Sequence, residues 1–241
     1  MAKHVLLNNI AHKDLKIITQ YSARFGDNLG STLTFPTEFG DIQREYPILF
    51  RKESANGKFQ SVVLLGFKPD ENLFLDEFRG WQADYIPAVI ERGPFLIGFQ
   101  DQRVDGGSER APVVHVDLDN PRVSEIEGKA VFLEHGGISP YLDRINQLLL
   151  RIYEGMQISD AMFDAFLALD LLEPVTLEIQ INEREQYCLQ GNYTISASKL
   201  AALGDKDIAH LHRSGFLRCA YLAMESLGNI QRLIQLKNTR T

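Results

Sequence analysis

The sequence predicts an α+β fold, in which a sheet-rich amino-terminal part packs against a helical carboxy-terminal part that contains a β-hairpin. Short apolar runs rich in β-branched and aromatic residues, separated by turn residues, are typical of strands and recur through residues 1–137. From residue 138 onward, apolar residues recur every three or four positions, which indicates helices. Period-two alternation at about 175–195 predicts the hairpin. We expect the mainly β part, 1–137, and the mainly α part, 138–241, to form one structural unit.

Six apolar runs are the predicted strands of the first part. Turn residues 54–57 between the first two runs indicate a hairpin. The paired glycines and alternating charges of DQRVDGGSERA, residues 101–111, are instead typical of an exposed loop. The runs are residues 47–50, 59–67, 72–75, 94–99, 112–118 and 130–133.

Two amphipathic helices are predicted directly after residue 138. The first has Ser139 as its N-cap and Pro140 at its first helical position. The second begins at Ser159 and stops at Pro174. Residues 197–241 return to helix, with caps at Ser198 and Asp205 and one apolar stripe formed by Leu217, Tyr221, Met224, Leu227, Ile230 and Leu233.

Composition argues against several classes of partner. The net charge is −7, from 32 acidic and 25 basic residues of interspersed sign, so nucleic acid is not expected as a partner. No apolar run approaches the roughly 20 residues that span a bilayer. The amino terminus shows no classical signal peptide, and the two cysteines are too few for a disulfide scaffold. We therefore expect a soluble cytoplasmic protein whose partner is a small molecule or another protein.

A series of landmarks in fixed order resembles the SapC family of bacterial proteins, from about residue 40 to 235. The resemblance rests on YPILFRK (46–52), FQSVVLLGF (59–67), ENLFLD (71–76), Trp81, DYIPAVIERGPF (84–95), DLLEP (170–174), LQGNYTI (189–195) and YLAMESLGNIQRL (221–233). The family name implies an association with paracrystalline surface layers. Relatives sit among genes for TonB-dependent uptake, flavin-dependent tryptophan halogenases and cupin-like proteins, and the resemblance implies no catalytic residue.

The segment DENLFLDEFRGWQADYIPA, residues 70–88, holds the only tryptophan and mixes aromatic, acidic and amide side chains. Gly80 allows a turn that presents Trp81 at a strand end. Polar groups beside an aromatic surface are the makeup of a small-molecule pocket. The alternative is that Trp81 and Tyr85 close the core while Asn72 and Asp76 cap backbone groups. The candidate ligand-binding residues are Asn72, Asp76, Trp81, Asp84, Tyr85 and Arg92.

One short motif has the chemistry of a metal site. His115 and Asp117 have the HxD form of a two-histidine, one-carboxylate iron site, for which His210 or His212 could supply the distal ligand. A hydrogen-bonded pair on a strand surface fits the same spacing. We otherwise expect no cofactor, and Fe(II) is the alternative.

A second motif allows an atypical hydrolase. Ser196 and Lys199 match SxxK, in which a lysine one helical turn away activates a serine. A helix cap followed by a solvated lysine explains the same residues.

Three functional hypotheses follow. The first is a non-catalytic binding or accessory protein linked to the uptake or modification of an aromatic metabolite or peptide. The second is an enzyme, either a non-haem iron oxygenase or an atypical hydrolase, and the third is a surface-layer-associated protein. Apolar residues outside the final stripe allow a homodimer; they are Leu222, Ile234 and Leu236.

Overall fold

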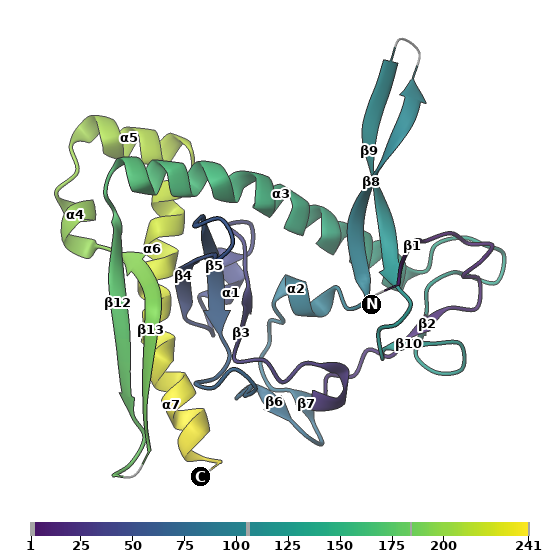
Figure 1. Ribbon diagram of the computed structural model, residues 1–241, viewed down its shortest axis with the longest axis horizontal. Coiled ribbons are helices and arrows are strands. Elements are labelled where there is room, and N and C mark those ends of the chain that lie inside the picture. The colour runs from purple at the N-terminus through teal and green to yellow at the C-terminus, as the bar shows by residue number, and fades with distance from the viewer. Residues whose placement is uncertain (1–2, 105–106, 184, 241) are drawn as a thin grey trace. The chain divides into compact units, whose positions relative to one another are not determined.

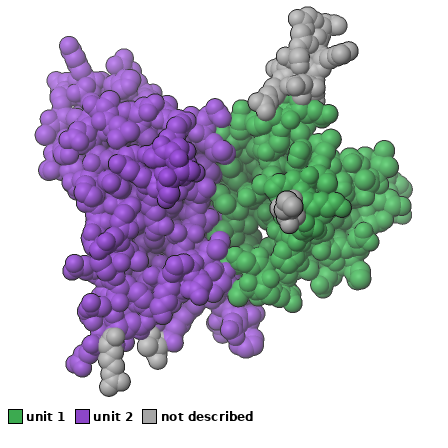
Figure 2. All heavy atoms as spheres, viewed as in Figure 1, with its two compact units in different colours: residues 1–27, 88–153 green, residues 28–87, 154–241 purple. Residues whose placement is uncertain are grey.

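The computed structural model describes residues 3–104, 107–183 and 185–240, and it confirms a mixed α+β architecture (Figure 1). The chain forms two compact units, each made of two sequence segments (Figure 2). Unit 1 comprises residues 1–27 and 88–153, and unit 2 comprises residues 28–87 and 154–241. The predicted division at residue 137 into a mainly β and a mainly α part stays a prediction.

Unit 1 contains two small antiparallel sheets, together with η1 (Ala23–Phe25) and α2 (Ala88–Glu91). Its interior is fixed by Arg122, whose buried guanidinium donates to the Asp27 carboxylate at 2.6 Å and to the carbonyl of Ile18 at 3.1 Å. The first sheet has the order β1 (His4–Leu6), β9 (Gly107–Asp117), β8 (Phe95–Val104), and the second has the order β10 (Val123–Ser124), β2 (Lys16–Ile17), β11 (Lys129–Ala130).

The expectation of an exposed loop over residues 101–111 was wrong. Strands β8 and β9 continue through most of that stretch and pair in register as far as Val104 and Gly107, forming a long antiparallel hairpin (Figure 1). Residues 105–106 lie outside the described residues. The backbone ladder therefore overrides the loop-like composition, since strand pairing satisfies backbone groups whatever the side chains are.

Unit 2 is organised around a five-stranded antiparallel sheet. The aromatic ring of Phe50 on its central strand packs edge-on against Phe163 of helix α3 (Pro140–Ala168), at a centroid distance of 5.2 Å. Helix α6 (Phe216–Ser226) packs against β4 and β13. The sheet order is β12 (Leu172–Gln180), β13 (Gln186–Ile195), β4 (Ile48–Lys52), β5 (Phe59–Leu64), β3 (Ser31–Leu33). The remaining elements of this unit are α1 (Phe39–Ile42), β6 (Leu75–Asp76), β7 (Gly80–Trp81), α4 (Ala197–Ala201), α5 (Asp205–Arg213), η2 (Leu227–Asn229) and α7 (Ile230–Asn238).

The two predicted hairpins of this unit are present. Strands β4 and β5 flank the predicted turn at 54–57, and β12 and β13 form the hairpin expected at about 175–195. No helix within the described part of the chain is long and apolar enough to cross a membrane.

The two helices predicted after residue 138 are one continuous helix, α3. Ser139 caps it as expected, because its hydroxyl oxygen accepts the N–H of Leu142 at 3.1 Å. Ser159 does not begin a second helix; its hydroxyl donates to the carbonyl of Gly155 four residues back, which a mid-helix serine can do without ending the helix. The prediction that the helix ends at Pro174 was also wrong, because α3 ends at Ala168. Pro174 lies in β12, an edge strand, where a missing N–H is tolerated.

The details of the last helices also differ from the prediction. Ser198 lies inside α4, whose N-cap is Ser196, and Asp205 is the first residue of α5 rather than its cap. Helix α6 buries Ala220, Ala223 and Ser226, whereas Tyr221 of the predicted stripe is exposed. Small side chains let this helix approach the sheet closely enough for the Ser226 hydroxyl oxygen to accept the N–H of Ile48 at 2.8 Å.

Candidate functional site

Two of the six predicted ligand-binding residues line a cleft in unit 2, which we call the Glu45 cleft. Asp84 and Tyr85 contribute the segment that leaves β7. The cleft has a volume of about 470 Å³, within the range of small-molecule sites. Its lining residues are Asp41, Arg44, Glu45, Asp84, Tyr85 and Arg232.

The carboxylate of Glu45 holds the wall of this cleft together. It accepts the backbone N–H groups of Asp84 at 3.0 Å and Tyr85 at 2.9 Å, and it pairs with the guanidinium of Arg232 on α7 at 2.9 Å. The Glu45 side chain is only 11% exposed. One buried acid therefore fixes the 84–85 backbone and the last helix in a single arrangement.

Trp81 does not line the cleft, but hydrogen bonds through Tyr46 connect it to the lining residue Tyr85. Its indole N–H donates to the Tyr46 hydroxyl at 2.9 Å, and that hydroxyl donates to the backbone carbonyl of Tyr85. Burial raises the pKa of Tyr46, and the hydrogen bond from Trp81 offsets part of this rise. Tyr46 is thus a neutral donor in a continuous chain that links Trp81 to the cleft wall.

The ring of Tyr85 is anchored at its far end as well. Its hydroxyl donates to the carboxylate of Glu38 at 2.8 Å, and the other oxygen of Glu38 accepts the Thr34 hydroxyl at 2.9 Å. Both Glu38 and Thr34 are almost completely buried. With its backbone and hydroxyl both held, Tyr85 presents a fixed aromatic surface to the cleft.

Charged groups of both signs remain available at the rim. Among the described residues, neither the Arg44 guanidinium nor the Asp84 carboxylate has a side-chain hydrogen bond or ion pair, and both residues are exposed. The charges of Glu45 and Arg232 are paired with each other. The cleft can therefore offer one cation and one anion to a ligand without breaking its own supporting contacts.

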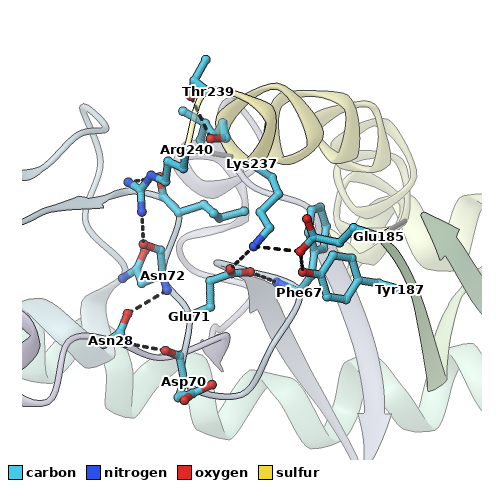
Figure 3. Close-up of polar contacts among 12 residues, drawn as sticks. Asn28, Phe67, Asp70, Glu71, Asn72, Glu185, Tyr187, Lys237, Thr239 and Arg240 are labelled. Carbon is cyan, nitrogen blue, oxygen red and sulfur yellow. Dashed lines mark hydrogen bonds and ion pairs between the residues drawn. The ribbon is translucent and has the colours of Figure 1, made fainter. Parts of the chain in front are cut away.

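Asn72 and Asp76, two other predicted ligand residues, hold backbone groups. The side-chain oxygen of Asn72 accepts the N–H of Phe74 at 3.0 Å, and its backbone carbonyl accepts a bond from Arg240 (Figure 3). Asp76 accepts the N–H groups of Arg79 and Phe78 at the β6–β7 turn, and these bonds lower its pKa. Both contacts correspond to the alternative in which these residues cap backbone groups.

Arg92, the sixth candidate, belongs to unit 1. Its guanidinium donates to the carbonyl of Phe95 at 2.6 Å, and burial lowers its pKa. The structure therefore brings Asp84 and Tyr85 together in one cleft and places Arg92 in a different unit.

A second charged cluster in unit 2 surrounds Lys237 of α7, and we call it the Lys237 cluster (Figure 3). The Lys237 ammonium pairs with Glu71 at 2.7 Å and with Glu185 at 3.3 Å. Tyr187 donates its hydroxyl to Glu185, and the Lys237 ammonium lies 5.6 Å from the centre of the Tyr187 ring. Burial alone would lower the pKa of Lys237, but the bonds to Glu71, Tyr187 and Glu185 raise it. A lysine held in its charged form is unsuited to nucleophilic attack.

The HxD pair of the predicted iron site and its proposed distal ligands lie on two different elements. His115 and Asp117 are on β9 in unit 1, and His210 and His212 are on α5 in unit 2. The Asp117 carboxylate accepts the backbone N–H of Lys3 at 3.1 Å. Within the described residues, no group of three or more His, Cys, Asp or Glu side chains is placed to hold a metal ion. The Fe(II) site stays a prediction, to be checked by the metal content of the purified protein.

The serine and lysine of the predicted hydrolase motif have other partners. The Lys199 ammonium pairs with Asp170 at 2.8 Å, and the Ser196 hydroxyl lies 3.2 Å from the Ser198 hydroxyl. Ser196 is the N-cap residue of α4. This geometry matches a helix start with a paired surface lysine better than an activated serine.

Sequence reasoning missed most of the residues that build the cleft. One local signal was present for Glu45, an acidic residue placed directly before the apolar run Tyr46–Phe50. Arg232 could not be identified locally, since it lies on a helix 187 residues from its partner. The missed residues are Glu38, Asp41, Arg44, Glu45, Tyr46 and Arg232.

Comparison with known proteins identifies one family. The model of the SapC family matches residues 7–233 of this chain. No curated protein and no solved structure shows a significant match.

Proposed function

Since the chain belongs to the SapC family, for which the resemblance implies no catalytic residue, we propose that it is a non-catalytic accessory protein that binds a short peptide or a similar zwitterionic metabolite in the Glu45 cleft. The observation that carries this proposal is the pair of available opposite charges, Arg44 and Asp84, on a cleft whose wall is fixed by Glu45.

The two rim charges match the two ends of a zwitterion. The Asp84 carboxylate would accept the ammonium group of the ligand, and the Arg44 guanidinium would donate to its carboxylate. Charge-assisted hydrogen bonds of this kind are stronger than neutral ones. Because Glu45, Tyr46 and Glu38 already hold the wall, binding would order few additional groups, which favours affinity.

The neighbouring genes implied by the family resemblance support an accessory role. TonB-dependent uptake proteins and flavin-dependent tryptophan halogenases act on small molecules, which an accessory protein could deliver to them. A binding protein without its own chemistry would fit either the uptake or the modification step.

The test uses alanyl-alanine and two analogues that each lack one charge. N-acetyl-alanyl-alanine has no ammonium group, and alanyl-alaninamide has no carboxylate. Isothermal titration calorimetry should show binding of the free dipeptide and about tenfold weaker binding of each analogue, if each ion pair contributes about 1.4 kcal/mol. Fluorescence of Trp81 gives a second readout, because its indole is connected to the cleft through Tyr46.

Variants of the rim residues assign each charge to its partner. In Asp84→Asn, acetylation of the dipeptide should no longer weaken binding, and in Arg44→Ala amidation should no longer weaken it. The matched controls are Asp207→Asn and Lys206→Ala, two exposed charges on α5 that should leave both penalties unchanged. The proposal would be rejected if the dipeptide does not bind. It would also be rejected if acetylation still weakens binding to Asp84→Asn and amidation still weakens binding to Arg44→Ala.

A further inference from the structure

A second cleft in unit 2 lies between the β4–β5 hairpin and the end of helix α3, and we call it the hairpin cleft. Its volume is about 400 Å³. The hairpin contributes Lys52, Asn56, Gly57, Lys58 and Phe59, and the helix contributes Asp160, Phe163, Asp164 and Leu167. None of these residues lines the Glu45 cleft.

The apolar wall of this cleft is rigidly built. The rings of Phe59 and Phe163 stack with their centres 5.8 Å apart, and Phe59 also meets Tyr193 edge-on at 5.0 Å. Phe163 is in turn packed edge-on against Phe50 in the core. Leu167, one turn further along α3, is 52% exposed and extends the apolar surface toward solvent. A flat apolar group would therefore find a fixed surface here.

Two of the four charges in the cleft neutralise each other. The Lys58 ammonium pairs with Asp160 at 3.1 Å, and both side chains are largely exposed. The other two charges, Lys52 and Asp164, have no ion pair among the described residues. Within the described part of the chain, the Lys52 ammonium contacts the faces of Phe59 and Tyr193, at 5.2 and 5.5 Å from the ring centres.

The remaining cation, the remaining anion and the apolar wall together define a ligand class. We propose that the hairpin cleft binds an aromatic α-amino acid, with its carboxylate on Lys52, its ammonium on Asp164 and its ring against Phe59 and Leu167. The ammonium of Lys52 lies close to the aromatic wall, so one ligand can reach both the charge and the apolar surface. This inference does not rest on the function proposed for the Glu45 cleft, because the two sites share no residue.

The first measurement is calorimetric titration of the full chain with L-phenylalanine and three analogues. 3-Phenylpropanoate lacks the ammonium group, phenethylamine lacks the carboxylate, and L-alanine lacks the ring. L-phenylalanine should bind about tenfold more tightly than either charge-deficient analogue, as expected for the loss of one ion pair. L-alanine should give no measurable heat, since it cannot cover the apolar wall.

Variants then assign the contacts. Lys52→Met should weaken L-phenylalanine and 3-phenylpropanoate about tenfold and leave phenethylamine unchanged. Asp164→Asn should weaken L-phenylalanine and phenethylamine and leave 3-phenylpropanoate unchanged. Leu167→Asn should weaken all three ring-bearing ligands. Lys52 and Leu167 are exposed, so these changes leave the core intact, and an unchanged thermal unfolding midpoint checks the fold of each variant.

The Glu45 cleft supplies the control that separates the two proposals. Arg44→Ala and Asp84→Asn should leave L-phenylalanine binding unchanged, while Lys52→Met and Asp164→Asn should leave alanyl-alanine binding unchanged. Failure of L-phenylalanine to bind, or binding that is insensitive to both Lys52 and Asp164, would overturn the assignment of the hairpin cleft. Loss of L-phenylalanine binding in the Glu45-cleft variants would also overturn it, by placing this ligand in the other site.

Discussion

Unit 2 contains two clusters built from the same kinds of side chain, and both include a cation of the last helix, α7. In the Lys237 cluster, the ammonium is shared between Glu71 and Glu185, and Tyr187 completes the set (Figure 3). In the Glu45 cleft, Arg232 and Glu45 pair in the same way, but Arg44 and Asp84 stand at the rim without such partners among the described residues.

The difference separates charges that stabilise the fold from charges that can bind a ligand. A charge that already has partners contributes to stability, and a ligand would have to displace those partners. A charge at the rim of a fixed cleft contributes little to stability and keeps its hydrogen-bonding capacity. Substitutions of the two kinds of charge should therefore have opposite profiles: replacing a paired charge should mainly affect unfolding, and replacing a rim charge should mainly affect binding.

The largest effect on stability is expected for Glu45→Ala. This change removes the acceptor for two backbone N–H groups and leaves Arg232 without its partner. Loss of these bonds should cost about 3 kcal/mol, or a drop of about 6–12 °C in the unfolding midpoint. Thermal unfolding followed by circular dichroism measures it, with the exposed Glu225→Ala on α6 as the matched control. A midpoint within 2 °C of the wild type would show that Glu45 does not hold the wall.

A smaller effect is expected for Lys237→Met, and its pH dependence is specific. At neutral pH the midpoint should fall by about 2–4 °C, which corresponds to roughly 1 kcal/mol in a domain of this size. Lys58→Met is the control, since its pair with Asp160 is largely exposed and should contribute less than about 1 °C.

The sign of the pH dependence follows from two opposite shifts. The Tyr187 hydroxyl and then Lys237 lower the pKa of Glu185 from its ordinary value of 4.5, so the stabilisation is complete above that value and is lost as pH falls through the lowered pKa. The raised pKa of Lys237 maintains its charge up to its ordinary value of 10.5 and beyond. The difference between wild type and Lys237→Met should therefore be constant from about pH 5 to 10 and shrink in acid. A difference that grows in acid would contradict the ion-pair explanation.

The fold class and the hairpins could be predicted from the sequence because they depend on local patterns. Alternation at period two and turn residues mark β4–β5 and β12–β13, which pair as expected. The continuity of α3 could not be predicted, since Ser159 is equally suited to capping a new helix and to bonding back to Gly155.

The cleft was predictable only in part, for a related reason. Asp84 and Tyr85 could be nominated because they follow the single tryptophan in a segment of mixed chemistry. Glu45 acts on that segment across 39 residues, and Arg232 joins it across 187. The tertiary fold brings such partners together, and no local pattern in the sequence predicts them.

The smallest effects on stability are expected at the rim of the Glu45 cleft. Arg44→Ala and Asp84→Asn remove exposed charges that have no partner among the described residues, so each should change the free energy of unfolding by less than about 0.5 kcal/mol.

Stabilisation by the bound dipeptide should distinguish these variants from the wild type. Alanyl-alanine at 100 times its dissociation constant should stabilise the wild-type protein by about 2.7 kcal/mol. At the same concentration it should stabilise the Arg44→Ala, Asp84→Asn double variant by less than half as much. Thermal unfolding with and without the dipeptide measures both quantities together. Equal stabilisation of the wild type and the double variant would mean that Arg44 and Asp84 do not contribute to dipeptide binding. The proposed functional difference between the two clusters would then be rejected.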